Sequence, residues 1–255
     1  MKFTIAMPNY NYGQFVGEGI ESVLRQDYDD WELFVWDNCS TDNSVEVAQK
    51  YADMDSRVHV KVAERNSGGP IEGINNVFYQ YATGDIFLWL CSDDMMGKNY
   101  FTEVLPYFKD PEIGFVRIGC LIVPGPGNTT RKEEAYMRPI FWPRKEEILR
   151  ENKVYISSPF RKKLFFDVGG ITHYEYVEGE PYDQLKAPYF DWDFWIKCTF
   201  SGAKWATNMK PLLIYREHGS NASRTDDLDG MVRTLMARYQ GKIDTFKAHD
   251  KGGLA

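Results

Sequence analysis

The stretch Ile86-Phe87-Leu88-Trp89-Leu90-Cys91-Ser92-Asp93-Asp94 decides the fold class. Its first six residues form an apolar run that follows Gly84-Asp85, and such a run between polar segments is typical of a strand buried on both faces. Strands of this kind occur in sheets that helices cover. Asp93 and Asp94 come directly after the run, where open α/β sheets bind ligands. The stretch therefore predicts an α/β protein with a ligand site at these two carboxylates.

Two adjacent carboxylates admit two interpretations. Side chains of consecutive residues diverge, so Asp93 and Asp94 are expected to differ in role: one would hold a divalent cation, and the other would order its water shell or a sugar hydroxyl. Mn²⁺ and Mg²⁺ are hard ions that suit carboxylates and are often bound together with substrate phosphates. A solvated turn that caps the next helix explains the same two residues. The pair alone does not decide between these interpretations.

Patterns typical of strands and helices alternate through the first 110 residues. The sequence predicts strands at 2–7, 31–36, 58–63 and 86–90, and helices at 16–26, 43–51 and 71–82. This alternation indicates a parallel sheet with crossover helices. After residues 113–123 the regularity ends, and the predicted elements are helices at 160–168 and 192–200 and a strand within 205–215.

The remaining segments are less regular. Residues 172–190 contain four tyrosines and are expected to form a long loop, of the kind that is usually functional or mobile. Near the end, an apolar stripe with helical spacing runs from Leu228 to Phe246 and predicts a C-terminal helix. No linker interrupts the chain, so a single domain over residues 1–255 is expected.

Composition excludes several classes of protein. The net charge of -7 over 255 residues argues against a nucleic-acid binder, which normally has a basic face. Four scattered cysteines without a CxxC pair indicate neither a disulfide framework nor a zinc site, and they fit a reducing cytoplasm. The sequence shows no signal peptide and no apolar run of the roughly 18–20 residues that cross a bilayer. Peripheral contact with the inner face of a membrane stays open.

Polar residues follow the first two predicted strands. The first strand ends in Pro8-Asn9-Tyr10-Asn11, and the second ends in Asp37-Asn38-Cys39-Ser40-Thr41-Asp42. Both lie at the sheet edge expected for Asp93 and Asp94. Asp37 is expected to accept hydrogen bonds from a nucleobase or a ribose, and a plain turn residue is the alternative. Ser40, Thr41 or Asp42 is expected to cap the following helix.

Together these motifs resemble the inverting nucleotide-sugar glycosyltransferases of family 2, which have the GT-A fold. Pro8, Asn9 and Tyr10 are similar to the opening motif of that family, and Asp37 stands where its base-contacting aspartate does. The segment before the metal motif is matched by Asn66-Ser67-Gly68, Asn76 and Ala82-Thr83-Gly84-Asp85, with about two residues more than usual between Asn66 and Asn76. The resemblance implies that these residues bind the sugar nucleotide.

The metal motif departs from the family pattern. Where the family has Asp-x-Asp-Asp, this chain has Cys91-Ser92-Asp93-Asp94. A thiol is a poor partner for a hard cation. The resemblance places the metal on Asp94 and puts Asp93 nearer to the ribose or the sugar.

Two motifs of the C-terminal half complete the resemblance. Phe190-Asp191 is similar to the Glu-Asp pair in which the aspartate is the catalytic base, although Asp191 is equally suited to cap the next helix. Asp193 is the reserve candidate for the base. The stretch from Tyr215 to Asn221 is similar to Arg-x-His-x-x-Ser, whose histidine completes the metal site, so the resemblance makes His218 a metal ligand.

The resemblance thus implies an inverting, hexosyltransferase-like enzyme that needs Mn²⁺ or Mg²⁺. Its partners would be a nucleoside-diphosphate sugar and a saccharide or glycolipid acceptor, as in polysaccharide or glycolipid assembly. Residues 1–110 would bind the donor, 111–225 would hold the acceptor and the base, and 226–255 would form a helix and tail. A sugar-nucleotide nucleotidyltransferase and a non-catalytic nucleotide-sugar-binding module are the alternatives. A nucleotidyltransferase typically has a glycine-rich loop with basic residues, and the chain lacks such a loop after its first strand. The replacement of the first aspartate of the metal motif by Cys91 is compatible with a non-catalytic binding module.

Overall fold

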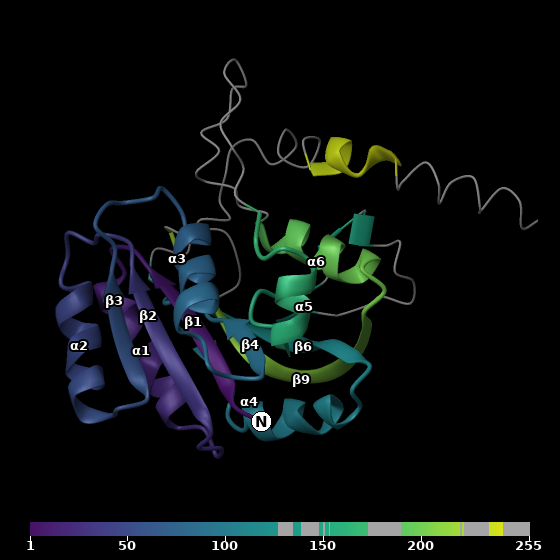
Figure 1. Ribbon diagram of the computed structural model, residues 1–255. Coiled ribbons are helices and arrows are strands. Elements are labelled where there is room, and N and C mark those ends of the chain that lie inside the picture. The colour runs from purple at the N-terminus through teal and green to yellow at the C-terminus, as the bar shows by residue number, and fades with distance from the viewer. Residues whose placement is uncertain are drawn as a thin grey trace, which may run out of the picture.

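The computed structural model describes residues 1–126, 135–138, 148–149, 151–152, 154–172, 190–219, 221 and 235–241. Figure 1 shows one twisted sheet with helices against both of its faces. The predicted α/β class is confirmed. Residues 173–189, most of the predicted tyrosine-rich loop, lie outside the described residues, as do 222–234 and 242–255 of the predicted C-terminal part.

The N-terminal part of the sheet is parallel. Its strands are β1 (Phe3–Asn9), β2 (Trp31–Asp37), β3 (Val58–Val62) and β4 (Ile86–Trp89), in the order β3-β2-β1-β4. The crossovers are α1 (Gly13–Leu24), α2 (Ser44–Met54) and α3 (Ile71–Asn76), which continues as the π-helical turn η1 (Val77–Tyr81). These are the elements that the sequence predicts. The strand order reverses between β1 and β4, and open α/β sheets generally bind ligands at such a reversal, beyond the carboxyl ends of the strands.

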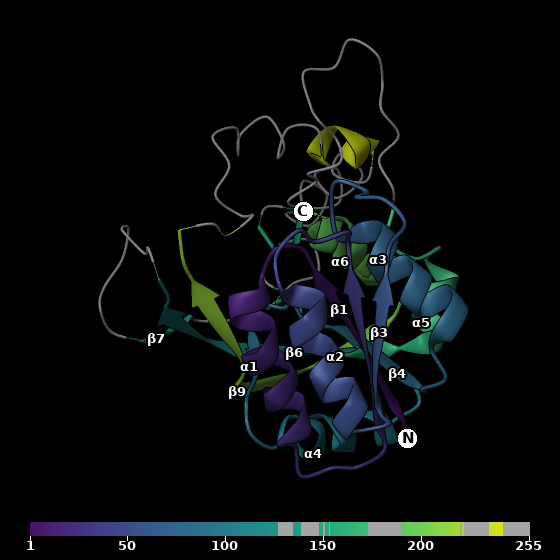
Figure 2. The ribbon, with the colours of Figure 1, turned by 90° about the vertical axis from the view of Figure 1, so that its left-hand side faces the viewer.

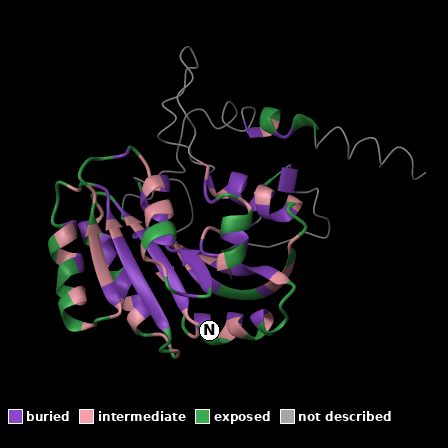
Figure 3. Cartoon of the chain, viewed as in Figure 1, coloured by how far each residue is buried: buried purple, intermediate pink, exposed green. Residues whose placement is uncertain are grey.

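Two apolar cores on opposite faces of the sheet result from the alternation along each strand. In β4, Ile86 and Leu88 belong to one core and Phe87 and Trp89 to the other. Helices α1 and α2 lie together on one face, which is turned toward the viewer in Figure 2. The strands are buried throughout the centre of the molecule, as Figure 3 shows. A strand covered on both faces explains why the run before Asp93 is almost wholly apolar.

The C-terminal part extends the sheet beyond β4. It contains β5 (Met95–Met96), β6 (Ile113–Pro124), β7 (Tyr136–Arg138), β8 (Phe160–Arg161) and β9 (Lys204–Glu217). The order continues β4-β8-β6-β9-β5, and β7 pairs with β6. Strands β4 and β8 are antiparallel, whereas β6 and β9 are parallel. The prediction of a parallel sheet therefore holds for the first half only, and the complete sheet is mixed.

Short elements account for the differences from the predicted ranges. The helix expected at 160–168 is α5 (Lys162–Asp167), because its first two residues pair with β4 as β8. The turns α4 (Tyr100–Val104) and η2 (Leu105–Lys109) and the two-residue strand β5 were not predicted, since pieces this short carry no period. Helix α6 (Phe190–Phe200) begins near the expected place. The cap expected at Ser40, Thr41 or Asp42 is not formed, because the N-cap residue of α2 is Asn43, whose side chain makes no capping hydrogen bond. Asp42 precedes it, and its carboxylate accepts a hydrogen bond from Ser44 N at 2.9 Å.

No helix among the described residues is both long enough and apolar enough to cross a membrane.

A buried carboxylate ties the amino ends of the central strands together. Glu32 is 5% exposed and accepts hydrogen bonds from Thr4 Oγ1 at 2.6 Å and from Thr83 N at 2.6 Å. Lys2 Nζ lies 2.6 Å from its Oε2. Burial alone would raise the pKa of this carboxyl, but the hydrogen bonds from Lys2, Thr4 and Thr83 outweigh burial and lower the pKa below its ordinary value.

We expect Glu32→Gln to lower the free energy of unfolding by about 2–3 kcal/mol, because the glutamine amide places an N–H donor where one of the two carboxylate oxygens of Glu32 accepts hydrogen bonds. A lowered folded pKa stabilises the fold above the unfolded pKa of about 4.3, and this stabilisation is lost as the pH falls through the folded pKa. Urea unfolding at several pH values measures both effects.

The matched control is Glu46→Gln, since Glu46 is exposed and pairs only with Lys50 one helical turn away. This change should move the free energy of unfolding by less than about 0.5 kcal/mol. Equal stabilities of the two variants would contradict the role given to Glu32.

Candidate active site

Asp94 occupies a buried turn immediately after β4. A hydrogen bond from Asp94 N to Cys91 O, 3.0 Å long, closes this turn. The Asp94 side chain is 1% exposed, and its Oδ1 accepts a hydrogen bond from the backbone N–H of Arg216 at 3.0 Å. Its Oδ2 is buried and has no hydrogen-bond partner. One oxygen of this carboxylate is thus fixed by β9, and the other is left for a ligand.

Asp93 contacts the predicted metal-binding histidine. His218 Nε2 lies 3.0 Å from Asp93 Oδ2, and Asn221 Nδ2 donates to the same oxygen at 3.4 Å. His218 is 1% exposed, and its ring packs 4.8 Å from the ring of Phe15 and 5.5 Å from that of Tyr12. Helix α1 and the turn before it therefore hold the imidazole against Asp93.

Three side chains form a cluster with the spacing of metal ligands. The ligand atoms of Cys91, Asp93 and Asp94 all lie within 4.8 Å of one another. His218 contacts this cluster through Asp93. The resemblance had instead implied that His218 and Asp94 hold the metal together. His218 Nε2 and Asp93 Oδ2 lie 3.0 Å apart, at hydrogen-bond distance, and the histidine stands outside the group of three. The three clustered side chains, with a buried oxygen of Asp94 that no described residue contacts by a hydrogen bond, fit a divalent cation.

Negative charge is crowded at this cluster. Burial, followed by the neighbouring Asp93 carboxylate, raises the pKa of Asp94 well above its ordinary value. Burial also raises the pKa of the Cys91 thiol, and the carboxylates of Asp93, Asp94 and Asp191 raise it further. A cation bound here would relieve this repulsion. Asp191, from a distant part of the chain, is thus close enough to Cys91 to affect the pKa of its thiol.

The backbone of α1 lies directly against the turn from Cys91 to Asp94. A Cβ added at Gly19 would meet Asp94 O at 3.2 Å and Ser92 O at 3.3 Å, so glycine permits this close approach. Arg216 joins the same elements, since its Nε donates to Asp93 O at 3.1 Å and its guanidinium pairs with Glu18. The turn is therefore enclosed by α1 on one side and by the end of β9 on the other.

Asp191 lies in the first turn of α6 and is partly exposed. Its Oδ2 accepts a hydrogen bond from Asn152 Nδ2 at 2.8 Å, and the indole of the neighbouring Trp192 donates to Ile148 O at 2.5 Å. Burial raises the pKa of Asp191 to about 6, although the hydrogen bonds from Trp192 N and Asn152 act against it. A carboxyl with such a pKa is suited to accept a proton near neutral pH.

Asp193, the reserve candidate, has different surroundings. It is 1% exposed, accepts a hydrogen bond from Tyr239 Oη at 2.7 Å and lies 3.3 Å from Arg238 Nη1. Tyr239 and Arg238 belong to the described C-terminal segment, residues 235–241. Side chains two residues apart in a helix point in different directions. Asp193 therefore anchors this segment to α6, and Asp191 is the more accessible of the two.

Asp37 is the centre of a hydrogen-bond network at the ends of β1 and β2. It is 1% exposed and accepts hydrogen bonds from Asn9 Nδ2 at 2.8 Å, Ser40 N at 2.8 Å and Ser40 Oγ at 2.6 Å. Asn9 stands opposite Asp37 in the strand register. The turn role weighed as the alternative is thus present, and contact with a nucleobase stays a prediction.

The neighbours of Asn9 differ in exposure. Pro8 is half-buried, Tyr10 is 44% exposed, and Asn9 itself is 3% exposed. Asn9 Oδ1 is buried and has no hydrogen-bond partner. Pro8, Asn9 and Tyr10 therefore offer a ligand one free acceptor and one exposed ring beside Asp37.

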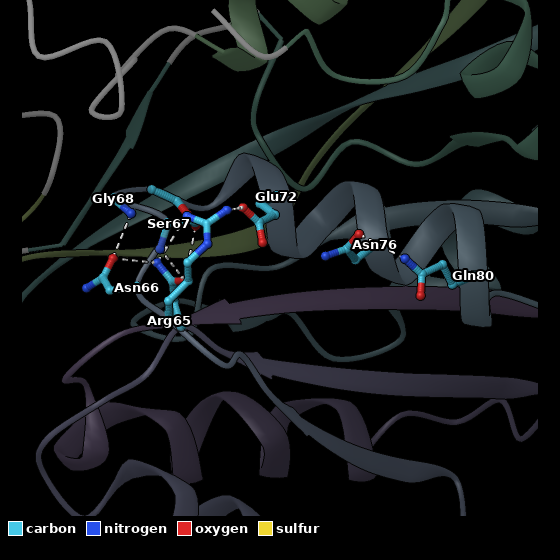
Figure 4. A network of polar contacts seen from close by, with 9 residues as sticks. Arg65, Asn66, Ser67, Gly68, Glu72, Asn76 and Gln80 are labelled. Atoms are coloured by element: carbon cyan, nitrogen blue, oxygen red, sulfur yellow. Dashed lines mark hydrogen bonds and ion pairs between the residues drawn. The ribbon is translucent and has the colours of Figure 1, made fainter. Parts of the chain in front are cut away.

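The two asparagines predicted to bind the nucleotide sugar lie apart, as Figure 4 shows. Asn66 lies in the loop before α3, where its Oδ1 accepts hydrogen bonds from Gly68 N at 2.7 Å and from Asn38 Nδ2 at 3.0 Å. Asn76 lies at the other end of α3, and its Oδ1 accepts a hydrogen bond from Gln80. Asn75 instead makes the long-range contact, since it exchanges two hydrogen bonds with the backbone of Ile171.

Sequence reasoning did not identify three residues of the site. Asn221 lies three positions beyond His218, inside a motif that was recognised, so this spacing was an available signal. Phe15 belongs to the apolar face of α1 and looks like an ordinary core residue. Asn152 lies in an irregular segment and carries no signal in the sequence.

Comparison with known families accounts for this arrangement. A model of the family "Glycosyl transferase family 2" matches residues 4–166. The chain therefore belongs to glycosyl transferase family 2.

Curated relatives agree with this assignment. The chain is 29% identical over 129 residues to the putative teichuronic acid biosynthesis glycosyltransferase TuaG of Bacillus subtilis, which covers 51% of this chain and 50% of TuaG. It is 32% identical over 114 residues to the poly(ribitol-phosphate) beta-N-acetylglucosaminyltransferase TarS of Staphylococcus aureus, covering 43% of this chain and 19% of TarS. The chain thus spans about half of the first relative and about a fifth of the second.

Solved structures share the fold. TarS 1–349 from S. aureus, in complex with UDP-GlcNAc, aligns with a TM-score of 0.66 at 21% identity over 92% of this chain and 65% of that one. The mannosyltransferase PcManGT from Pyrobaculum calidifontis, in complex with GDP-Man and Mn²⁺, aligns with a TM-score of 0.59 at 18% identity over 100% of this chain and 65% of that one. The expected GT-A fold is confirmed.

We expect Asp94→Asn to be more stable than the parent protein in the presence of a chelator. Asparagine keeps the acceptor for Arg216 N and removes a buried negative charge beside Asp93. The gain in the free energy of unfolding should be on the order of 1–3 kcal/mol near neutral pH, the usual cost of a buried group without a partner. Urea unfolding between pH 4 and 8 measures it.

Asp94→Asn should raise the free energy of unfolding because the pKa of Asp94 is higher in the folded protein than in the unfolded chain. The parent protein loses stability as the pH rises from the unfolded pKa toward the folded one, so the gain of the variant should grow with pH and disappear below about pH 4. Asp55→Asn is the control of opposite sign, because the hydrogen bond from Arg57 lowers the pKa of Asp55. If Asp94→Asn changed the free energy of unfolding equally at every pH, the raised pKa given to Asp94 would be contradicted.

Proposed function

We propose that this protein transfers a sugar, of the hexose type, from a nucleoside-diphosphate sugar to an acceptor hydroxyl with inversion at the anomeric carbon. One observation supports the proposal above the others: a partly exposed carboxyl with a raised pKa, Asp191, lies close enough to the Cys91–Asp93–Asp94 cluster to affect its electrostatics. A cation site and a base that share one site are the two parts that such a reaction needs.

The donor is proposed to bind along the carboxyl ends of β1, β2 and β4. Its base and ribose would lie near Asp37 and the exposed ring of Tyr10, with Pro8, Asn9, Asn66, Asn76 and Asp93 as the further proposed donor-binding residues. Family membership supports a nucleotide-sugar donor, and TarS was solved with UDP-GlcNAc. Asp37 already accepts hydrogen bonds from Asn9 and Ser40. It is therefore proposed to shape the nucleotide-binding loop through these bonds as well as to contact the nucleotide directly.

Asp94 and His218 are proposed to hold Mn²⁺ or Mg²⁺, and the position of Asp93 between them supports its participation. When bound, the cation supplies positive charge for the diphosphate that leaves. The chain contributes two buried carboxylates and an imidazole held by the rings of Phe15 and Tyr12. Mn²⁺ accompanies GDP-Man in the structure of PcManGT, which supports a divalent cation here.

Asp191 is proposed as the catalytic base. The acceptor hydroxyl would donate its proton to Asp191 while its oxygen attacks the anomeric carbon from the face opposite the diphosphate. This single displacement inverts the configuration and needs no nucleophile from the protein. Asn152 orients the carboxylate, and the position of Asp191 at the start of α6 fixes its direction.

The acceptor is proposed to be a saccharide or a glycolipid. TuaG is named for teichuronic acid biosynthesis, and TarS is named as a poly(ribitol-phosphate) beta-N-acetylglucosaminyltransferase, which supports an acceptor of this kind. A cytoplasmic location, with peripheral contact at the inner face of the membrane, is part of the proposal.

A non-catalytic module that binds nucleotide sugars is the competing function. The replacement of the first aspartate of the metal motif by Cys91 favours it, because a thiol suits hard cations poorly. The raised pKa of Asp191 favours the enzyme, since a binding module gains nothing from a desolvated base.

A panel of sugar nucleotides, with Mn²⁺, with Mg²⁺ or with a chelator, tests the proposed donor and metal. The expected result is a rise in melting temperature for one nucleotide series that depends on the cation, because a ligand of the native state stabilises it. Hydrolysis or transfer of the stabilising donor distinguishes the enzyme from the module. Full turnover in excess chelator would exclude the metal requirement.

We expect Asp191→Asn to fold and to bind the sugar nucleotide as the parent does, yet to lose about 10²–10⁴-fold in transfer rate. Asparagine retains an oxygen for Asn152 and lacks basicity. In the parent protein, the rate should fall as the pH drops below about 6, where Asp191 becomes protonated. Asp193→Asn is the matched control, because Asp193 is buried against Tyr239, and it should retain transfer within a few-fold. Reversed results for the two variants would make Asp193 the base.

A further inference from the structure

Cys91 lies where a cation bound by the two aspartates would meet its sulfur. The Sγ atom and the carboxylate oxygens of Asp93 and Asp94 lie within 4.8 Å of one another. In a tetrahedral site, a sulfur at about 2.3 Å from the ion and an oxygen at about 2.1 Å lie about 3.6 Å apart. Rotations of the three side chains that draw their ligand atoms together by up to about 1.2 Å would therefore bring all three residues onto one ion.

A second, independent observation points to a ligand at this place. Asp94 Oδ2 is buried and has no hydrogen-bond partner among the described residues, and Asp94 is 1% exposed. Buried polar atoms are nearly always satisfied, and a buried carboxylate oxygen especially so. Arg216 N occupies the other oxygen of Asp94, so Oδ2 is the atom of this carboxylate that is left for a ligand.

We propose that Cys91 is itself a metal ligand, so that this cluster is a mixed sulfur–oxygen site that prefers borderline cations such as Zn²⁺ and Co²⁺ to Mg²⁺. The inference rests on the proposed function, because it concerns the same cation, and it changes the chemical class of that cation. On binding, the thiol proton passes to solvent and the sulfur forms a bond to the metal, with no change in oxidation state.

Ligand chemistry gives the preference its direction. A thiolate favours zinc-like ions, whereas carboxylates and water favour Mg²⁺ and Mn²⁺. Asp93, Asp94 and His218 offer oxygen and nitrogen ligands that both groups of ions accept. The sulfur of Cys91 is therefore the group that discriminates between them, at the position where the family has an aspartate.

Titration of the intact chain with Co²⁺, followed by electronic absorption, tests the proposal. The parent protein should develop a sulfur-to-cobalt charge-transfer band that saturates at about one equivalent, because that band requires a coordinated thiolate. Cys91→Ser should lack the band and bind Zn²⁺ at least tenfold more weakly by calorimetry. Cys91→Asp should also lack the band and should bind Mn²⁺ and Mg²⁺ more tightly than the parent. Cys39→Ser is the matched control, since Cys39 is the exposed cysteine, and it should keep the band.

A second measurement needs no variant. Alkylation of the folded parent protein, mapped by mass spectrometry, should show Zn²⁺ protecting Cys91 and leaving Cys39 reactive. The proposal is overturned if Co²⁺ or Zn²⁺ binds without the band and without protection, or if neither ion binds to the folded protein. Transfer activity supported equally by Mn²⁺ in the parent and in Cys91→Ser would leave the proposed function standing while removing Cys91 from it. Failure of the parent protein to bind any sugar nucleotide would instead contradict the proposed function.

Discussion

Two carboxylates buried side by side at the end of β4 are the constraint on which the rest of the site depends. Asp94 is fixed by a backbone N–H of β9, whereas Asp93 is fixed by His218 and Asn221. Without these partners the burial of both charges would be prohibitive. The apolar run that precedes them has the complementary role, since a strand covered on both faces brings the turn into the interior and excludes water from one side of it.

The same crowding explains why family 2 membership and the geometry agree on function. A site that concentrates negative charge in a desolvated place favours a cation and, through it, a diphosphate. Asp191 extends this field from the other half of the chain, and burial raises its pKa to about 6, as its proposed role as the base for an acceptor hydroxyl requires. The proposed chemistry therefore needs no group beyond those that the fold already brings together, apart from the cation and the substrates.

Much of the first half could be predicted from the sequence. The strands β1 to β4 carry long, regular apolar patterns, and their carboxyl ends mark the position of Asp37 and of Asp93 and Asp94. The pairing of His218 with Asp93 could not be predicted, because it depends on β5, a strand of two residues that carries no period. Asn152 escaped for a related reason: its contact with Asp191 is set by tertiary packing of an irregular segment. The two-residue strand β8 likewise turned the expected parallel sheet into a mixed one.

The hydrogen bond from Arg216 of β9 to Asp94, in the turn after β4, has a consequence for how such chains can be recombined. Glycosyltransferases invite the idea of two modules, one for the donor and one for the acceptor, that might be exchanged between enzymes to change the product. In this protein the cut would pass through the proposed cation site, since Asp94 belongs to the first half and Arg216, whose backbone N–H binds Asp94, belongs to the second. A chimera joined near residue 110 would pair a foreign β9 with β5 and would need the same register, with Ile214 opposite Met95, to rebuild the site. Acceptor specificity in this chain is therefore better altered by grafting loops onto an intact sheet than by swapping halves.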